Sequence, residues 1–189
     1  MRTIATTRPQ RTLSVVPATD PVTAVVVRIA LPRGLERLRR RHDPAAAVGV
    51  PPHVTLLFPF LPVARLGPDI RRDLAKIARG VAPFEVSFAR VGRFPGVVYL
   101  VPDPADTFAS LTAAIWSKFA EYPPYGGAHS EVLPHLTLAD APNGTLDAIA
   151  GESDHWLPFG QQVGALELLA QGADMHWRSR WRVPLGVRR

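Results

Sequence analysis

The chain has 189 residues and a net charge of +6, with 47% hydrophobic and 20% charged residues. This length and composition are typical of one globular domain with a substantial core, and they exclude a disordered or fibrous chain. The sequence contains no cysteine, which excludes disulfides, thiolate metal ligands and a cysteine nucleophile. The basic excess lies near the N-terminus, at 33–41 and at 178–189, whereas residues 44–174 hold eight basic and thirteen acidic residues. Each basic cluster either attracts phosphate or forms a solvated surface.

The first 20 residues are basic, rich in threonine and interrupted by Pro9 and Pro17. They lack the continuous apolar run of an export signal, so we expect a flexible N-terminal tail (1–20) followed by a single bilobal domain (21–189). The longest uncharged stretch, 44–64, contains five prolines and is unsuited to a membrane-spanning helix. We expect a cytoplasmic monomer that does not associate with membranes.

The elements expected in chain order mix strands and helices. A β-branched run at 22–31 predicts a buried strand, and 34–43 predicts a short helix with Leu35 and Leu38 inward and its arginines outward. Further elements follow from the same patterns: a strand at 53–60, a helix at 68–79, a hairpin of 84–91 and 97–101, a helix at 106–122, a strand at 135–139, a helix at 145–155, and strands at 163–171 and 175–184. Because strands and helices do not alternate regularly, the order favours an α+β fold with helices packed on antiparallel sheets.

One pentapeptide occurs twice, as PHVTL at 52–56 and as PHLTL at 134–138. Each copy follows a loop and opens a predicted strand, as expected of two related halves. Residues i and i+2 of a strand point to the same face, so His53 lies beside Thr55, and His135 lies beside Thr137. If the halves pack about a pseudo-two-fold axis, the two pairs converge on one cleft.

Two imidazoles and two hydroxyls in one cleft suit the chemistry of a phosphodiester. A neutral histidine accepts a proton from the nucleophile, a protonated one donates a proton to the leaving oxygen, and the hydroxyls bind the non-bridging oxygens. The alternative chemistry is zinc, which would need both histidines and a third ligand. The candidates for that ligand are His129, His155, His176 or a carboxylate, and none has a recognised spacing. We therefore expect neither a metal nor another cofactor.

The two motifs and their flanks, PPHVTLLFPF (51–60) and LPHLTLAD (133–140), resemble the 2H phosphoesterase superfamily, in particular its 2′-5′ RNA ligase-like and cyclic-phosphodiesterase branch. The order of elements from about residue 22 to 185 is compatible with the whole family fold. The resemblance implies two pseudo-symmetric lobes of antiparallel sheet, with helices outside and a central cleft. It also implies that His53 and His135 are the catalytic pair and that Thr55 and Thr137 bind phosphate.

Other residues are candidates for contacts with the substrate. Four aromatic residues either stack on a base or serve only as packing: Phe58, Phe94, Tyr99 and Tyr125. In 175–183, strict alternation places His176, Arg178, Arg180 and Arg182 on one face of a strand and Trp177 and Trp181 on the other, core-facing one. The arginine face either binds RNA phosphates or is solvated. Phe58, Tyr99 and Arg178 are the substrate contacts that we predict beyond the two motifs.

Together these features predict a metal-independent phosphoesterase that hydrolyses, or reversibly ligates, 2′,3′-cyclic phosphate or 2′-5′ phosphodiester groups of RNA ends or nucleotides. Two alternatives stay open. One is a non-catalytic RNA-binding protein that uses the same cleft, and the other is a phosphoesterase for a non-RNA cyclic phosphoester. Turnover of a small cyclic mononucleotide would exclude the binding protein.

Overall fold

The computed structural model describes residues 21–128 and 132–186, which form two four-stranded antiparallel sheets. The first sheet has the order β2 (His53–Leu57), β1 (Thr23–Arg28), β7 (Ala165–Gln171) and β8 (Trp177–Pro184). The second has the order β5 (Leu136–Asp140), β4 (Val97–Asp103), β3 (Phe84–Phe94) and β6 (Phe159–Val163). The predicted N-terminal tail, 1–20, lies outside the described residues.

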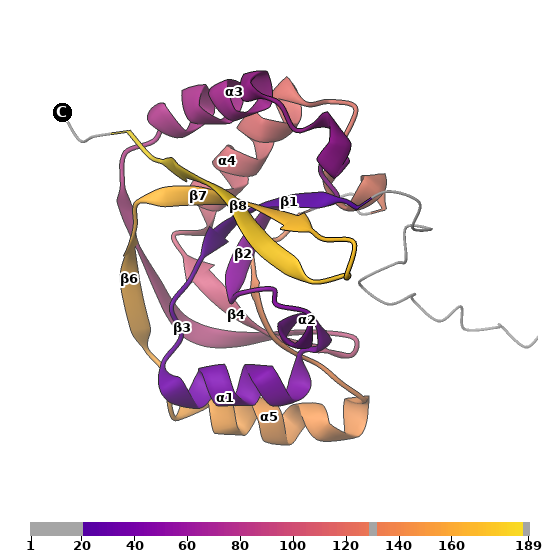
Figure 1. Cartoon of the computed structure of the whole chain (residues 1–189). Helices are drawn as coiled ribbons and strands as arrows, with labels where there is room; N and C mark the ends of the chain where they lie inside the picture. Colours follow the sequence, from indigo (N-terminus) through magenta and orange to yellow (C-terminus); the bar gives the residue numbers. More distant parts are fainter. Residues whose placement is uncertain (1–20, 129–131, 187–189) are drawn as a thin grey trace, which may run out of the picture.

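Four of the helices in the described residues pack on the two sheets in pairs (Figure 1). The helices of this part of the chain are α1 (Arg33–His42), α2 (Pro44–Ala47), α3 (Pro68–Arg79), α4 (Ala105–Lys118) and α5 (Leu146–Asp154), with short 3₁₀ turns η1 (Val63–Arg65), η2 (Pro124–Gly127) and η3 (Asn143–Thr145). Helices α3 and α4 contact the first sheet, and α1 and α5 contact the second. Helix α1 follows β1 but packs on β5, and α4 follows β4 but packs on β2. This reciprocal exchange holds the two lobes together around the strands that carry the repeated motifs.

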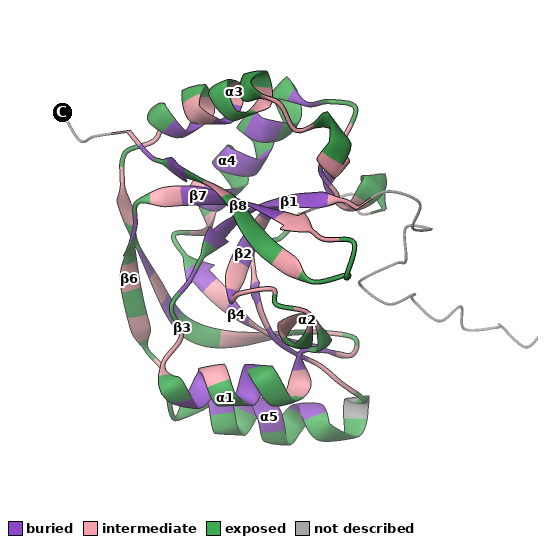
Figure 2. Cartoon of the chain, viewed as in Figure 1, coloured by how far each residue is buried: buried purple, intermediate pink, exposed green. Residues whose placement is uncertain are grey.

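Apolar periodicity explains the buried layers between sheets and helices (Figure 2). Helix α4 buries Phe108, Leu111 and Ile115 completely, because residues spaced by three or four share one helical face. Strand β1 (TAVVVR) is buried on both faces, as its continuous β-branched run predicts. Its Val25 and Val27 belong to the main core, whereas Ala24 and Val26 form a second, smaller apolar cluster with Leu169 on the opposite face of the sheet.

The α+β architecture of two antiparallel lobes matches the prediction, but several elements differ from it. Strand β6 and helix α2 were not predicted, because FGQQV has one hydrophobic residue at each end and PAAA is only one turn long. Helix α4 ends at Lys118 instead of 122. Strand β1 ends at Arg28 instead of 31, and β2 ends at Leu57 instead of 60.

The alternation predicted for 175–183 is wrong, because strand β8 contains a β-bulge. Leu168 pairs with Trp181 and Leu169 pairs with Ser179, so Arg180 is the extra residue. A bulge of one residue reverses the faces of the side chains on either side of it. Trp181 therefore packs against the main core, and Trp177 packs against the smaller cluster on the opposite face.

Candidate functional site

The first motif lies at the start of β2, where pairing with β1 sets its orientation. His53 pairs with Arg28 and Thr55 pairs with Val26, while Val54 is fully buried in the core. The Nδ1–H of His53 donates to the Pro51 carbonyl oxygen at 2.7 Å. Since a carbonyl only accepts, this bond places the proton of the neutral ring on Nδ1 and leaves Nε2 as an acceptor. Nε2 lies 3.1 Å from the Thr55 hydroxyl, which therefore donates to it.

The second motif repeats this backbone arrangement on the other sheet. His135 immediately precedes β5, and Thr137 pairs with Tyr99 of β4. The Nδ1–H of His135 donates to the Leu133 carbonyl oxygen at 2.7 Å, again two residues before the ring. Its Nε2 is thus also the nitrogen that carries an available lone pair when the ring is neutral.

The fold brings the two motifs together. Strands β2 and β5 contact each other although they belong to different sheets. The charge of a protonated His135 contributes to lowering the pKa of His53, which requires that the two rings lie near one another. The site therefore has two histidines with the same tautomer, one from each half of the chain.

Both histidines favour the neutral form. The pKa of His53 is lowered to about 4, mainly by burial and also by the positive charges of Arg39 and His135, against the opposing effect of the bond to Pro51. Burial also lowers the pKa of His135, again opposed by its bond to a carbonyl, Leu133. Nearby positive charge thus affects His53 in addition to burial, and this is the main electrostatic difference between the rings.

A buried ion pair lies behind the first motif. Arg39 was expected among the outward arginines of its helix, but it is only 2% exposed. It forms a 2.8 Å ion pair with Asp43 and donates a 2.9 Å hydrogen bond to the Val50 carbonyl oxygen. The sequence signal was the i, i+4 spacing of a basic and an acidic residue on the side of the helix that also carries Leu35. Arg39 therefore fixes the loop that leads into His53.

Tyr125 also contacts the first motif from a distant part of the chain. Its hydroxyl is hydrogen-bonded to the Thr55 side chain, and burial raises the pKa of this phenol. Its backbone N–H donates to the Phe58 carbonyl oxygen at 2.6 Å. The backbone of Tyr125 has a φ of 53°, in the left-handed region that is uncommon for a residue other than glycine. The sequence indicated Tyr125 as an aromatic candidate but gave no sign of its contact with Thr55.

The aromatic residues that were predicted to contact the substrate lie in two different places. Tyr99 stacks on Phe94 with ring centroids 4.3 Å apart, and both rings lie edge-on to His135 at 5.4 Å and 5.2 Å. An added Cβ on Gly92 would lie 2.4 Å from the Tyr99 ring, so glycine is needed beneath it. Phe58 is half-buried and packs against Trp177 at the smaller apolar cluster.

Arg178 is not brought to the motifs. It pairs with Ala170, on the face opposite Trp177, and donates hydrogen bonds to Asp174 at 3.0 Å and 2.6 Å. This ion pair holds the pKa of Asp174 well below its usual range. The side chain is exposed and already bonded, so its predicted role as a substrate contact is not supported by its position.

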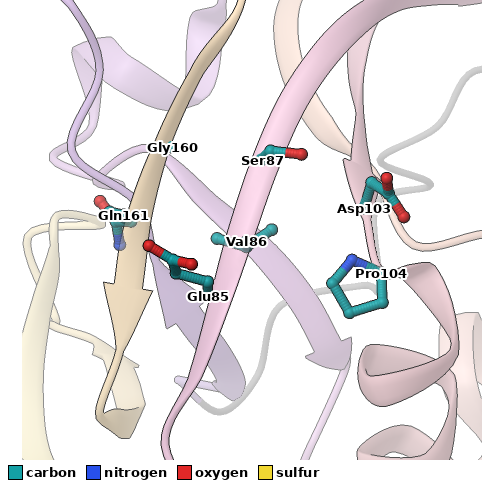
Figure 3. A pocket seen from close by; sticks show the side chains of 7 residues that line it. All are labelled: Glu85, Val86, Ser87, Asp103, Pro104, Gly160 and Gln161. Atoms are coloured by element: carbon teal, nitrogen blue, oxygen red, sulfur yellow. The ribbon is translucent and has the colours of Figure 1, made fainter.

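A cavity of about 410 Å³ lies on the second sheet (Figure 3), and neither His53 nor His135 is among the residues that line it. Glu85, Ser87 and Asp103 contribute its polar side chains. Tyr99 and Asp103 share one face of β4, so the cavity continues the face beside His135 about 13 Å farther along the strand. Within 21–128 and 132–186, no three His, Asp or Glu side chains are grouped to hold a metal ion. His129, one of the conceivable zinc ligands, lies outside that part of the chain.

A comparison with protein families shows the family to which the chain belongs. A model described as the 2′-5′ RNA ligase superfamily matches residues 26–174. The chain belongs to this superfamily. The matched range contains both histidine motifs and ends before β8.

Individual proteins match the chain with low sequence identity. The chain is 31% identical over 109 residues to a Bacillus cytotoxicus protein named "Putative phosphoesterase Bcer98_0945", a match that covers 54% of this chain and 58% of that protein. Among solved structures, TT0787 of Thermus thermophilus aligns with a TM-score of 0.57 and 19% identity, covering 89% of this chain and 100% of that one. E. coli LigT complexed with 3′-AMP aligns with a TM-score of 0.54 and 19% identity, covering 88% and 98%. These structural similarities establish the fold.

No helix in the described parts of the chain combines the length and the apolar character needed to cross a membrane.

Proposed function

We propose that the protein is a metal-independent phosphoesterase that acts on 2′,3′-cyclic phosphate or 2′-5′ phosphodiester groups of RNA ends or nucleotides. The observation that carries the proposal is the pair of histidines from the two halves, each with Nδ1–H bonded to a carbonyl oxygen two residues before it. In each ring this arrangement leaves Nε2 to exchange a proton with the substrate. Superfamily membership and the complex of E. coli LigT with 3′-AMP support a nucleotide-like substrate.

We assign His53 as the general base and His135 as the general acid. A base must be neutral, and the buried Arg39 beside His53 disfavours a second positive charge there. His135 is affected by burial and lies edge-on to the stacked pair of Phe94 and Tyr99, without a cationic side chain among the causes of its shift. The single negative charge of a phosphodiester favours a protonated ring beside it, and His135, which has no cationic side chain among the causes of its shift, takes that proton more readily than His53.

The hydrolytic step then balances as follows. Nε2 of His53 accepts a proton from water as the water oxygen forms a bond to phosphorus. The bond from phosphorus to one ribose oxygen breaks, and Nε2–H of His135 donates a proton to that oxygen. The hydroxyls of Thr55 and Thr137 donate hydrogen bonds to the non-bridging oxygens, where negative charge increases in the transition state. Ligation is the same step with the 5′-hydroxyl of a second ribose in place of water: its oxygen forms the bond to phosphorus, the bond from phosphorus to the 3′ oxygen breaks, and a 2′-5′ linkage results.

The test is turnover of 2′,3′-cyclic mononucleotides in excess EDTA by the wild-type protein and by His53→Ala, His135→Ala and His176→Ala. We expect wild-type turnover that is unchanged by EDTA, loss of activity in the first two variants, and normal activity in His176→Ala, because His176 is exposed and outside the site. Activity that is lost in EDTA and restored by Zn²⁺ or Mn²⁺ would overturn the mechanism. Binding of nucleotide without turnover would instead support an RNA-binding protein.

A further inference from the structure

A row of four side chains crosses the face of the first sheet that carries Thr55. Strand pairing aligns Thr55 with Val26, Val26 with Glu167, and Glu167 with Arg182. Directly paired residues of neighbouring strands point to the same face. Glu167 therefore shares a surface with the candidate phosphate-binding hydroxyl, two strands or about 10 Å away.

Glu167 is a buried carboxylate with an unsatisfied oxygen. The residue is 8% exposed, and Oε2 has no hydrogen-bond partner within the described part of the chain. The other buried carboxylate, Asp43, differs in this respect, because it pairs with Arg39 and accepts a hydrogen bond from the Ala45 N–H. A buried acceptor without a partner is unfavourable, so Glu167 is poised to accept a hydrogen bond from a group outside the chain.

The surroundings of Glu167 fit the nucleoside part of a substrate. Val26 and Leu169 on the same face are buried and apolar, and the partly buried rings of Phe58 and Trp177 pack against them, so the carboxylate lies beside an aromatic-covered apolar cluster. Arg182, across from it on β8, is exposed. A ribose attached to a phosphate at Thr55 would lie next to that hydroxyl, so a group two strands away belongs to the base. The position therefore favours a nucleobase over a ribose hydroxyl as the donor to Glu167.

We propose that Glu167 forms a base-recognition subsite that accepts a hydrogen bond from the amino group of a nucleobase. This inference rests on the proposed function and names the substrate that the site prefers. A carboxylate only accepts hydrogen bonds. Cytosine presents an N4 amino donor at the position where uracil presents the O4 carbonyl acceptor. The subsite thus selects cytosine over uracil and repels the uracil carbonyl.

The experiment compares kcat/KM for 2′,3′-cyclic CMP and 2′,3′-cyclic UMP. We expect the wild-type protein to prefer the cytidine substrate about tenfold or more, the discrimination typical of one polar base contact. Glu167→Gln should abolish or reverse the preference, because its amide can donate to the uracil O4. Glu85→Gln is the matched control, since Glu85 is exposed and lines the separate cavity on the second sheet; its preference should equal that of the wild type.

Two results would overturn the inference: no preference in the wild type, or an unchanged preference in Glu167→Gln. An unchanged preference that comes with an equal loss of kcat/KM for both substrates would indicate a ribose contact. The ratio of kcat/KM for the cytidine and uridine substrates is measured on the wild-type protein, so it tests the expected preference even if Glu167→Gln does not fold. If neither cyclic nucleotide is turned over, the proposed function fails, and calorimetric binding of cytidine and uridine 3′-monophosphates still tests the subsite by the same preference.

Discussion

The two motifs are nearly identical in sequence, and their histidines have the same backbone bond, yet their surroundings differ. His53 has a buried ion pair behind it, with its Nε2 bonded to Thr55. His135 lies edge-on to the stacked rings of Phe94 and Tyr99. The duplicated strand supplies the orientation of the rings, and the elements packed on each copy supply the difference in proton affinity. The comparison teaches that a repeated motif can give its two histidines different electrostatic surroundings, and the proposed mechanism uses that difference to assign one ring as base and the other as acid.

The largest effect that tests this comparison is the loss of either histidine. We expect His53→Ala and His135→Ala each to lower kcat/KM by about 10²–10⁴-fold, because each removes one proton-transfer group. The pH profiles should separate them. The wild-type profile of kcat/KM should be a bell with its maximum below pH 6.5, since the pKa of His53 is about 4 and that of His135 is also lowered.

Below the pKa of His53 the base is protonated, so the rate falls as pH decreases. Above the pKa of His135 the acid is neutral, so the rate falls as pH increases. His53→Ala should lose the acidic limb, and His135→Ala should lose the alkaline limb. The reverse result would exchange the two roles. Thermal melts of both variants should remain close to that of the wild type.

The second effect concerns the ion pair that distinguishes the first motif. Arg39→Met leaves the 5%-exposed Asp43 carboxylate without its ion-pair partner, so we expect the free energy of unfolding to fall by about 3–5 kcal/mol. Removing the positive charge also raises the pKa of His53, which should move the acidic limb of the rate profile to higher pH. Denaturant unfolding and the pH profile measure the two consequences.

Arg40→Met is the control for this change. Arg40 is on the same helix, and its side chain is 73% exposed in the pair with Glu36, so both stability and pH profile should stay near the wild type. An Arg39→Met variant with an unshifted acidic limb would show that charge does not distinguish the two histidines.

The third effect separates the two threonines. We expect Thr55→Val and Thr137→Val each to lower kcat by about 10²–10³-fold, the loss typical of one oxyanion donor, while the branched side chain preserves the strand. Thr55→Val should also move the acidic limb of the pH profile to higher pH. The Thr55 hydroxyl stabilises neutral His53 by donating to Nε2, so its loss raises the pKa of that ring. Thr137→Val should leave both limbs in place. Thr→Ser at either position should restore most of the rate, and failure to do so would assign the loss to packing.

Sequence alone predicted the features of the site that depend on local periodicity. Extended backbone places His53 beside Thr55 whatever the rest of the fold does, so the motifs and the α+β class followed from the pattern. Arg39 was expected to face outward, because the arginine-rich pattern of its helix hid the ion pair with Asp43 and the bond to the Val50 carbonyl oxygen. The contact of Tyr125 with Thr55 had no sequence signal, because the two residues are far apart along the chain. The bulge at Arg180 gave no signal in a strictly alternating sequence, and it places Arg178 and Arg182 on opposite faces of the sheet, where alternation predicted one face for both.

The smallest effect tests the aromatic side of the comparison through Gly92. Gly92→Ala would place a methyl group 2.4 Å from the Tyr99 ring, so that ring has to move away from its position beside His135. A misplaced catalytic environment should lower kcat by about 10- to 100-fold, with the alkaline limb of the pH profile displaced and the acidic limb unchanged. Gly151→Ala is the matched control, because an added Cβ there meets no atom within 4 Å. If Gly92→Ala shifts neither rate nor alkaline limb, the stacked rings serve packing alone, and burial is sufficient to set the proton affinity of His135.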